Sequence, residues 1–284
     1  MSSCLVQGSE EWLEMRKNKI GASDAPILMG VSPWSTPYRL WCEKLSLVEP
    51  RQKTFAMNRG LELEDEARHE FEMKTGLIMF PDVVFSDEFD FMMASLDGID
   101  IERKNIVEIK CPGKEDHEMA MDGIVPEKYI PQLHHQMIVS GLDKCFYFSY
   151  TKNSSKVLEV ERSDSYNKVL ISKEKEFWRC IQDFESPKLC EKDYDERTDD
   201  LWVHAAMKWK EAKKNLEMLE EQEKDLRQSL ICLSGKSNVK GAGIKLLKVV
   251  RKGSISYQEI PELSGLNLER YRKPPIETWR LGEG

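Results

Sequence analysis

The amino-acid sequence predicts an α/β fold in which a mixed sheet is flanked by helices, followed by a long C-terminal helix and a small basic appendage. Helix-type apolar patterns fill the chain up to Gly76, and period-two patterns rich in β-branched and aromatic residues follow it. After Asp200 the apolar residues recur at spacings of three and four. With 284 residues, of which 40% are hydrophobic and 32% charged, the chain has the composition of a globular protein.

The expected helices begin at residues that favour helix starts. Ser9 caps a short helix that runs to about Lys19, and Ser23 begins a second helix with Pro26 in its first turn. A third helix follows Thr36. Further helices are expected over residues 57–75, 131–140 and 166–184.

Five strands are expected, over residues 78–85, 89–95, 106–110, 144–151 and 156–161. The first three would form an antiparallel meander, and a helix would separate the third strand from the fourth. Asp97 would lie at the end of the second strand, where Gly98 permits a turn, and Pro112 ends the third strand. The core is therefore predicted to occupy residues 1–200.

The remaining chain is predicted to differ from the core. Residues 201–234 are predicted to form one long helix whose coiled-coil seam is interrupted at Glu223. This helix could pack on the core, dimerise or bind a partner. Residues 235–284 form an appendage with a Gly/Ser/Lys-rich linker over 235–243 and strands over 244–250 and 253–257. Between Lys236 and Arg280 there are ten basic and four acidic residues. This basic segment would hold DNA backbone, dock a partner or be purely structural.

Composition narrows the classes of function and location. Lys and Arg total 42 against 50 Asp and Glu, so the formal charge is −8 and any nucleic-acid contact must come from a local patch. No apolar run approaches the ~20 residues of a membrane-spanning helix, and the start of the chain shows no leader pattern. The seven cysteines form no CxxC pair. We therefore expect a cytoplasmic protein with no membrane partner, no disulfide framework and no zinc knuckle.

The main chemical motif is Asp97 followed, after ten residues, by Glu108-Ile109-Lys110. In a strand alternate side chains share a face, so Glu108 and Lys110 would point to one site, and the meander would bring Asp97 beside them. Two carboxylates with open water positions suit Mg²⁺, with Mn²⁺ as the alternative. The amine of Lys110 would orient or deprotonate the attacking water. The competing interpretation is a chance pattern on a solvated hairpin.

Glu64 is a third acidic candidate. On its helix it shares a side with Ala67 and Phe71, and a carboxylate on an apolar face needs a partner. That partner is either the predicted metal site or Arg68, one turn further along the helix.

The histidines are expected to play no part in metal binding. His134 and His135 are adjacent on a helix and therefore face different directions, with no third soft ligand nearby. His69 and His117 are expected at the surface.

A series of short motifs appears in order along the first half of the chain. They are Gly8-Ser9-Glu10-Glu11-Trp12-Leu13 with Arg16, Ile20-Gly21-Ala22-Ser23-Asp24, Gly30-Val31-Ser32-Pro33-Trp34, Thr36-Pro37-Tyr38, Arg59-Gly60 with Glu64 and Ala67-Arg68, Thr75-Gly76, Ser95-Leu96-Asp97-Gly98, and Glu108-Ile109-Lys110-Cys111-Pro112. Together they resemble the YqaJ-like viral recombinase family, which is lambda exonuclease-like and belongs to the PD-(D/E)XK nucleases. The resemblance covers about residues 8–150 and implies a restriction-endonuclease-like core.

The resemblance also implies an activity and a set of site residues. It implies a metal-dependent 5'-3' exonuclease that degrades linear double-stranded DNA and leaves 3' single strands for an annealing protein in phage-type recombination. By motif, Asp97, Glu108 and the carbonyl of Ile109 correspond to the Mg²⁺ ligands, and Lys110 to the residue that activates water. Glu64 corresponds to the helical acid that family members place near the metal.

Three further residues are implied to bind DNA or its 5' phosphate. Arg16 matches the arginine that binds the 5' phosphate, and Ser23, just before a helix N-terminus, is placed to assist it. Gln132 matches the glutamine that follows the ExK strand in related nucleases.

Two other functions stay open at this point. One is an endonuclease with the same metal site, and the other is a non-catalytic module that binds DNA ends or a partner. The resemblance implies a homo-oligomer, with a ring trimer as the family precedent, although the C-terminal third departs from the shorter family members. A viral origin would place the protein in the host cytoplasm or nucleoid.

Overall fold

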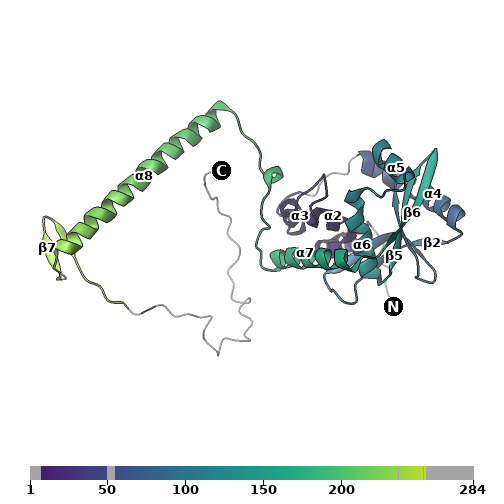
Figure 1. The fold of residues 1–284 in the computed structure, drawn as a ribbon, viewed down its shortest axis with the longest axis horizontal. Coiled ribbons are helices and arrows are strands. Elements are labelled where there is room, and N and C mark those ends of the chain that lie inside the picture. The colour runs from purple at the N-terminus through teal and green to yellow at the C-terminus, as the bar shows by residue number, and fades with distance from the viewer. Residues whose placement is uncertain (1–7, 50–54, 236, 252, 254–284) are drawn as a thin grey trace. The chain divides into compact units, whose positions relative to one another are not determined.

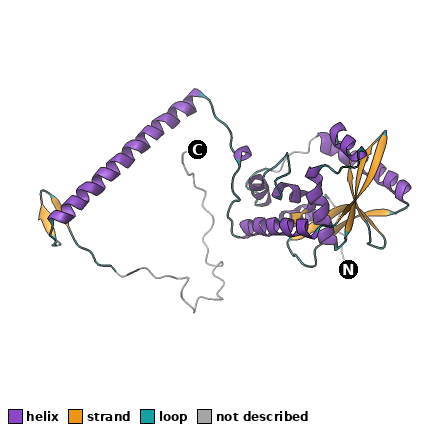
Figure 2. Ribbon diagram, viewed as in Figure 1, coloured by secondary structure: helices purple, strands orange, loops and turns teal. Residues whose placement is uncertain are grey.

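The computed structural model describes residues 8–49 and 55–253, apart from residues 236 and 252 (Figure 1). The chain divides into two compact units, Met1–Tyr194 and Asp195–Gly284. The first unit contains a six-stranded mixed sheet with helices on both faces (Figure 2), as the sequence predicts. None of the helices in the described part of the chain has the length and apolar character needed to cross a bilayer.

The helices and strands of the first unit follow the expected order. They are α1 (Glu10–Lys17), β1 (Ile20–Gly21), η1 (Ala22–Asp24), α2 (Ala25–Leu28), α3 (Pro37–Lys44), α4 (Phe55–Thr75), β2 (Met79–Phe85), β3 (Met92–Asp100), β4 (Ile106–Lys110), α5 (Lys114–Met121), η2 (Glu127–Tyr129), α6 (Ile130–Ser140), β5 (Lys144–Thr151), β6 (Ser154–Glu161), α7 (Asp164–Gln182) and η3 (Glu191–Asp193).

Ser9, the predicted cap, begins α1, and Thr36, after which the third helix is predicted, begins α3. The side chain of Ser9 accepts a hydrogen bond from the amide of Trp12 at 3.2 Å, and Thr36 accepts one from the amide of Arg39 at 3.0 Å. The helix predicted at Ser23 is shorter than expected. It starts as the 3₁₀ turn η1 and ends with α2, because the chain turns at Gly30, where φ is 78°. The prediction that Ser23 begins this helix is wrong, because Ser23 lies inside η1, which begins at Ala22.

β3 is the central strand and has partners on both edges. β2 runs antiparallel along one edge, since Met79 pairs with Asp100 and Phe85 with Met93. The other edge is shared: β1 pairs in parallel with the start of β3, and β4 pairs antiparallel with Gly98 and Ile99. On that edge none of the described strands pairs with residues 94–97. β5 then lies parallel to β4, and β6 antiparallel to β5.

Gly98 lies inside β3, so the prediction of a turn there is wrong. A Cβ atom at this position would lie 2.8 Å from the Cβ of Met79 and 2.8 Å from Cγ1 of Val107. Glycine is therefore required because the neighbouring strands approach closely at this point.

Two apolar clusters fill the two faces of the sheet. The larger cluster lies on the side of α2, α3, α6 and α7, and the smaller lies under α4. Ala67 and Phe71 of α4 pack in the smaller cluster with Val107, Ile109 and Phe148. Because Ile109 faces α4, its neighbours along the strand point toward α6 on the opposite face.

α5 was not predicted from the sequence, and it corrects one expectation about the histidines. His117 on α5 is buried, with Nδ1 2.8 Å from Ser149 Oγ and Nε2 2.8 Å from Ser154 Oγ. It attaches α5 to β5 and β6. His69 is exposed, as expected, with its side chain 76% accessible.

The described part of the second unit contains α8 (Asp200–Leu233), capped by Asp199, and a hairpin of β7 (Val239–Gly241) and β8 (Ile244–Leu246). β7 occupies part of the expected linker, so that prediction is wrong in part. The strand expected over 244–250 ends at Leu246. The strand expected over 253–257 lies outside the described residues, apart from Gly253.

Candidate functional site

The Asp97 and Glu108 carboxyl groups lie where β3 and β4 separate. The antiparallel ladder between these strands includes Gly98 with Val107, and it does not continue to Asp97 and Glu108. Instead, Oδ2 of Asp97 accepts a hydrogen bond from the amide of Ile109 at 2.8 Å. A side chain thus replaces the missing ladder contact and holds the carboxyl group of Asp97 against β4.

Glu108 is almost completely buried and is surrounded by hydrogen-bond donors. Lys110, two residues further along β4, donates to Oε1 of Glu108. Two glutamines one turn apart on α6 also donate: Gln132 to Oε1 at 2.6 Å, and Gln136 to Oε2. Charge-assisted hydrogen bonds of this kind hold a buried carboxylate in one orientation. The predicted Glu108, Lys110 and Gln132 therefore lie together, and Gln132 contacts Glu108 directly.

The electrostatics of this group show an excess of negative charge. Burial raises the pKa of Asp97 well above its usual value, and the charge of Glu108 raises it further. Burial alone would lower the pKa of Lys110, but Glu108 and Asp97 reverse this and hold the pKa of Lys110 above its usual value. Lys110 is therefore a cation here, and the two carboxyl groups together still attract further positive charge.

Glu64 pairs with Arg68, one of the two partners that its sequence context allows. Arg68 donates to Glu64 at 2.7 Å, so the ion pair one turn along α4 is present. The charges of Glu108 and Lys110 also act on Glu64, whose pKa is raised mainly by burial. Arg68 in turn donates to the main-chain carbonyl of Asp97 at 2.8 Å, which ties α4 to the carboxylate group.

The donor atoms available here fit a hard divalent cation. Among the described residues no group of three or more His, Cys, Asp or Glu side chains is arranged to hold a metal ion by itself. Asp97 and Glu108 nevertheless present oxygen ligands only, beside the main chain of Ile109. Mg²⁺ commonly uses one or two protein carboxylates and retains several waters, so two carboxylates with unbalanced charge suit it.

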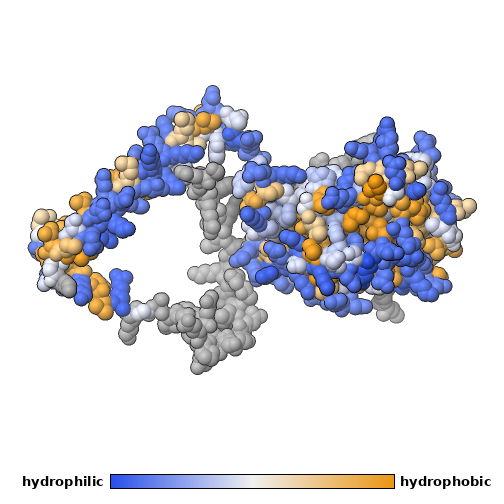
Figure 3. Space-filling view, in the orientation of Figure 1, coloured by the Kyte–Doolittle hydropathy of each residue, from blue (hydrophilic) through white to orange (hydrophobic). Residues whose placement is uncertain are grey.

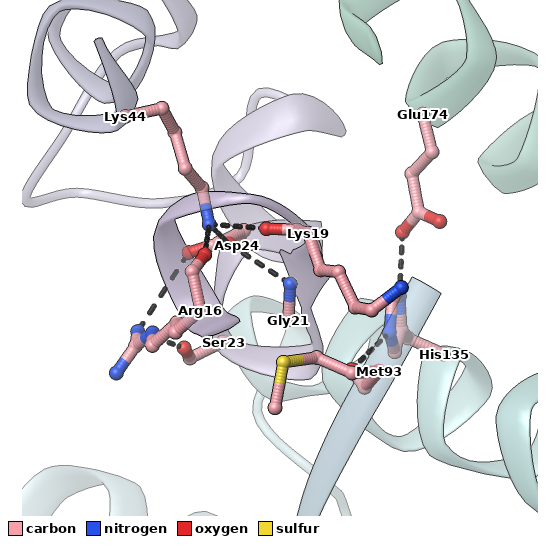
Figure 4. Close-up of polar contacts among 9 residues, drawn as sticks. All are labelled: Arg16, Lys19, Gly21, Ser23, Asp24, Lys44, Met93, His135 and Glu174. Atoms are coloured by element: carbon pink, nitrogen blue, oxygen red, sulfur yellow. Dashed lines mark hydrogen bonds and ion pairs between the residues drawn. The ribbon is translucent and has the colours of Figure 1, made fainter. Parts of the chain in front are cut away.

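Arg16 and Ser23, the residues implied to bind a 5' phosphate, also lie together (Figure 4). Nη2 of Arg16 donates to Oγ of Ser23 at 2.7 Å, and its guanidinium group lies over the ring of Trp12 at 5.1 Å. Ser23 is exposed and the side chain of Arg16 is 39% accessible. The two side chains form a partly open donor group that an anion in solvent can reach.

Asp24 and Lys44 form a buried ion pair directly behind Arg16 (Figure 4). Nζ of Lys44 lies 2.6 Å from Asp24 and donates to the carbonyls of Arg16 at 2.8 Å and Lys19 at 2.6 Å. Asp24 also accepts from the amide of Gly21 at 3.0 Å. Burial alone would raise the pKa of Asp24, but Lys44 and Arg16 hold it below its usual value. The pair thus fixes the end of α1 against η1.

Both groups are anchored to the same edge of β3. β1, which precedes Ser23, pairs with Met92 and Met93, and Asp97 lies four residues further along that strand. Between them, Nε1 of Trp12 donates to Oγ of Ser95 at 2.9 Å and attaches α1 to the strand. Residues 94–97 of β3, which have no strand partner on this edge among the described residues, therefore connect the carboxylate group to the arginine group.

Sequence reasoning missed Gln136, Asp24 and Lys44. Gln136 follows Gln132 by one helical turn, so the spacing on α6 is a signal that points to a shared contact. Asp24 and Lys44 are separated by 20 positions in the sequence, and no local spacing relates them. Their pairing depends on how α3 packs against η1.

Part of the chain is similar to one family model and to one curated protein. Residues 11–143 match the model of the YqaJ-like viral recombinase domain. The chain is 31% identical over 175 residues to the uncharacterized protein YqaJ of Bacillus subtilis (strain 168), a match that covers 60% of this chain and 55% of that protein. The chain thus spans about half the length of that relative.

Two solved structures of one enzyme are similar to the chain. The alkaline exonuclease LHK-Exo from Laribacter hongkongensis is 26% identical, with a TM-score of 0.54 over 62% of this chain and 94% of that chain. The complex of LHK-Exo with dAMP is 25% identical, with a TM-score of 0.55 over the same shares of both chains.

Proposed function

Because residues 11–143 match the model of the YqaJ-like viral recombinase domain, we propose that this protein is a metal-dependent exonuclease that degrades linear double-stranded DNA from its 5' ends. The family and the restriction-endonuclease-like α/β fold predicted from the sequence are both confirmed. The proposed product is a duplex with 3' single-stranded tails, which an annealing protein would use in phage-type recombination.

The observation that carries the proposal is the group formed by Asp97, Glu108 and Lys110. Two carboxyl groups and an ammonium group meet where β3 and β4 separate, and Gln132 and Gln136 hold Glu108 in place. A module that only binds DNA does not require two converging carboxylates, because they repel phosphate. The resemblance to an alkaline exonuclease supports the same conclusion.

In the proposed mechanism Asp97, Glu108 and the Ile109 carbonyl hold the divalent cation. When bound, Mg²⁺ would polarise the scissile phosphate and lower the pKa of a coordinated water. Lys110 offsets the negative charge that develops on the phosphate and orients the attacking water. Glu64 pairs with Arg68, which donates to the main-chain carbonyl of Asp97, and so helps to keep Asp97 in position.

Arg16 and Ser23 are proposed to bind the 5' phosphate at the end of the DNA. The guanidinium group supplies charge and directional donors, and the exposed hydroxyl of Ser23 supplies a further hydrogen bond. Holding the terminal phosphate would place the next phosphodiester bond at the carboxylate group, which accounts for a preference for ends.

The test is digestion of a linear duplex labelled at either end, beside a closed circle of the same DNA, with and without Mg²⁺. We expect only the linear DNA to be degraded, from its 5' ends and only with the metal. Cutting of the circle would replace the exonuclease with an endonuclease at the same site. If neither DNA is degraded, the non-catalytic interpretation takes its place.

Two variants connect this activity to the carboxylate group. Glu108→Gln keeps the size of the side chain, and Lys110→Ala removes the ammonium group. We expect each to lower the rate at least about a hundredfold, the scale of losing one electrostatic contribution in a transition state. Glu62→Gln is the control, because it makes the same chemical change at an exposed residue of α4. Wild-type rates in Glu108→Gln at saturating Mg²⁺ would contradict the assignment of the site.

A further inference from the structure

α8 carries an apolar seam, interrupted only at Glu223, that the proposed nuclease chemistry does not use. In heptad notation its a positions are Trp202, Trp209, Leu216, Glu223 and Leu230, and its d positions are Ala205, Ala212, Leu219, Leu226 and Leu233. No described residue of α8 is buried, and the five seam leucines are 40–83% exposed. Figure 3 shows hydrophobic patches alternating with hydrophilic surface along this helix. A seam with this period is the pattern that a second helix covers in a coiled coil.

We propose that the seam of α8 binds the α8 helix of a second copy of this chain in an antiparallel coiled coil. The seam continues over the whole length of the helix, from Trp202 to Leu233, so the pairing surface has the same extent in both copies. A second copy offers a stripe of identical length and period. The choice between parallel and antiparallel pairing follows from Glu223 and from the charges beside the seam.

Glu223 excludes the parallel arrangement in register. In that arrangement each a position faces its own copy, so two Glu223 carboxylates would meet inside the seam and repel each other. Lys208 at position g would also lie beside Lys213 at position e of the second copy. In the antiparallel arrangement an a position faces a d position, and Glu223 faces Ala212. Arg227 already neutralises Glu223 on its own helix at 2.8 Å.

The register that overlaps the two helices completely also matches side-chain size. Trp202 then faces Leu233 of the second copy, and Trp209 faces Leu226. Ala205 faces the larger Leu230 of the second copy. Each alanine of the seam therefore lies opposite a larger residue, which is the complementarity that close packing of two helices requires.

The charges beside the seam select the same register. In antiparallel coiled coils position e lies beside position e of the second helix, and this register places Lys213 beside Glu220 of the second copy. Symmetry produces this attractive contact twice. A shift of one heptad in either direction would bring Lys213 against Lys213 or Glu220 against Glu220. Complete overlap is therefore the register in which these charges attract.

The first test is the mass of the full-length protein in solution, measured by sedimentation equilibrium. We expect the wild-type mass to be an even multiple of the 33.0 kDa chain and the mass of Leu219→Glu to be half of it. Equal masses for wild type and Leu219→Glu would overturn the proposal.

Charge reversal at position e tests the direction of pairing and leaves the apolar residues of the seam unchanged. Lys213→Glu places a second carboxylate beside Glu220 at both symmetric contacts, so we expect the dissociation constant of the pair to rise about tenfold. Combining it with Glu220→Lys should restore the wild-type value. The intrahelical contact of Lys213 with Glu217, at 3.9 Å, is not restored in the double variant, so recovery would identify the contact between helices.

Lys214→Glu is the matched control, because position f faces away from the seam. It makes the same change of charge one residue further along and should leave the dissociation constant unchanged. Tighter association of Lys213→Glu would indicate a parallel pair and overturn the proposal. The same effect from Lys213→Glu and Lys214→Glu would also overturn it.

Discussion

Lys44 governs how much of the charge of Arg16 is available to a phosphate. Asp24 lies 2.6 Å from Lys44 but 3.7 Å from Arg16, so its negative charge is directed mainly to the buried lysine. Arg16 is left to hydrogen-bond with Ser23 and to face solvent. A buried carboxylate that lost Lys44 would draw the guanidinium group toward itself.

This arrangement predicts an effect of Lys44→Met on end recognition. We expect Arg16→Ala to abolish the preference for 5'-phosphate over 5'-hydroxyl ends, and Lys44→Met to reduce it about tenfold, the scale of one ionic hydrogen bond. The ratio of the two cleavage rates is measured, because it does not depend on the fraction of folded protein.

The double variant Lys44→Met with Asp24→Asn removes both buried charges and should restore the preference. Lys17→Met is the control, since Lys17 lies on α1 with its side chain 48% exposed. An unchanged ratio in Lys44→Met would show that Asp24 does not compete for Arg16.

Gly98 predicts a local effect on stability. Gly98→Ala would place a methyl group 2.8 Å from both Met79 and Val107, so β2, β3 and β4 must move apart. We expect the free energy of unfolding to fall by about 1–3 kcal/mol, the usual cost of overpacking. Urea denaturation measures it. Gly60→Ala makes the same change in helix α4, where nothing lies within 4 Å, and should raise stability by about 0.5–1 kcal/mol. A Gly98→Ala variant as stable as wild type would contradict the observed strand spacing.

At the scale of the element, α6 connects several parts of the first unit. Gln132 and Gln136 hold Glu108, while His135 points elsewhere, to the carbonyl of Met93 at 3.0 Å and to Glu174 of α7 at 2.7 Å. Figure 4 shows His135 between these two partners. The carbonyl can only accept, so Nε2 of His135 carries a proton. α6 is thus locked to β3, β4 and α7 by side chains that face different directions.

The buried pair of His135 and Glu174 predicts a pH-dependent stability. Burial alone would lower the pKa of His135, but Glu174 more than offsets this, so the pKa of His135 lies above its ordinary value. A histidine whose pKa is higher in the folded than in the unfolded protein stabilises the fold fully at pH values below its unfolded pKa. This stabilisation is lost as the pH rises through its folded pKa.

We therefore expect His135→Asn to lower the free energy of unfolding by about 3 kcal/mol at pH 6 and by less at pH 9. Urea denaturation at both pH values measures the difference in unfolding free energy. His69→Asn is the control, because His69 is exposed and should give no such difference. An equal loss for His135→Asn at both pH values would contradict an ionic pair.

At the scale of the whole molecule, the proposed chemistry lies in the first unit and the proposed pairing seam in the second. The chain carries a formal charge of −8, whereas the segment from Lys236 to Arg280 has ten basic and four acidic residues. Most of this segment lies outside the described residues. Its predicted role in holding DNA or docking an annealing protein stays a prediction.

Local patterns were sufficient for most elements of the fold. The capping residues Ser9 and Thr36 predict the starts of two helices, and period-two patterns predict the main strands, because these signals depend on neighbours in the sequence. They failed at Gly98, where a glycine needed for close strand approach looks like a turn glycine. They also missed β1, which consists of Ile20 and Gly21 and exists only through its pairing with β3.

By itself, the sequence determined the α/β class, the resemblance to the YqaJ-like family and the residues that form the carboxylate group. Alternation along a strand is enough to place Glu108 and Lys110 on one face. Only the tertiary structure decided that Gln136 holds Glu108, that Asp24 pairs with Lys44, and that His117 is buried. These contacts join residues far apart in the chain, and a buried polar group takes whichever partner the packing of helices on the sheet brings within hydrogen-bond distance.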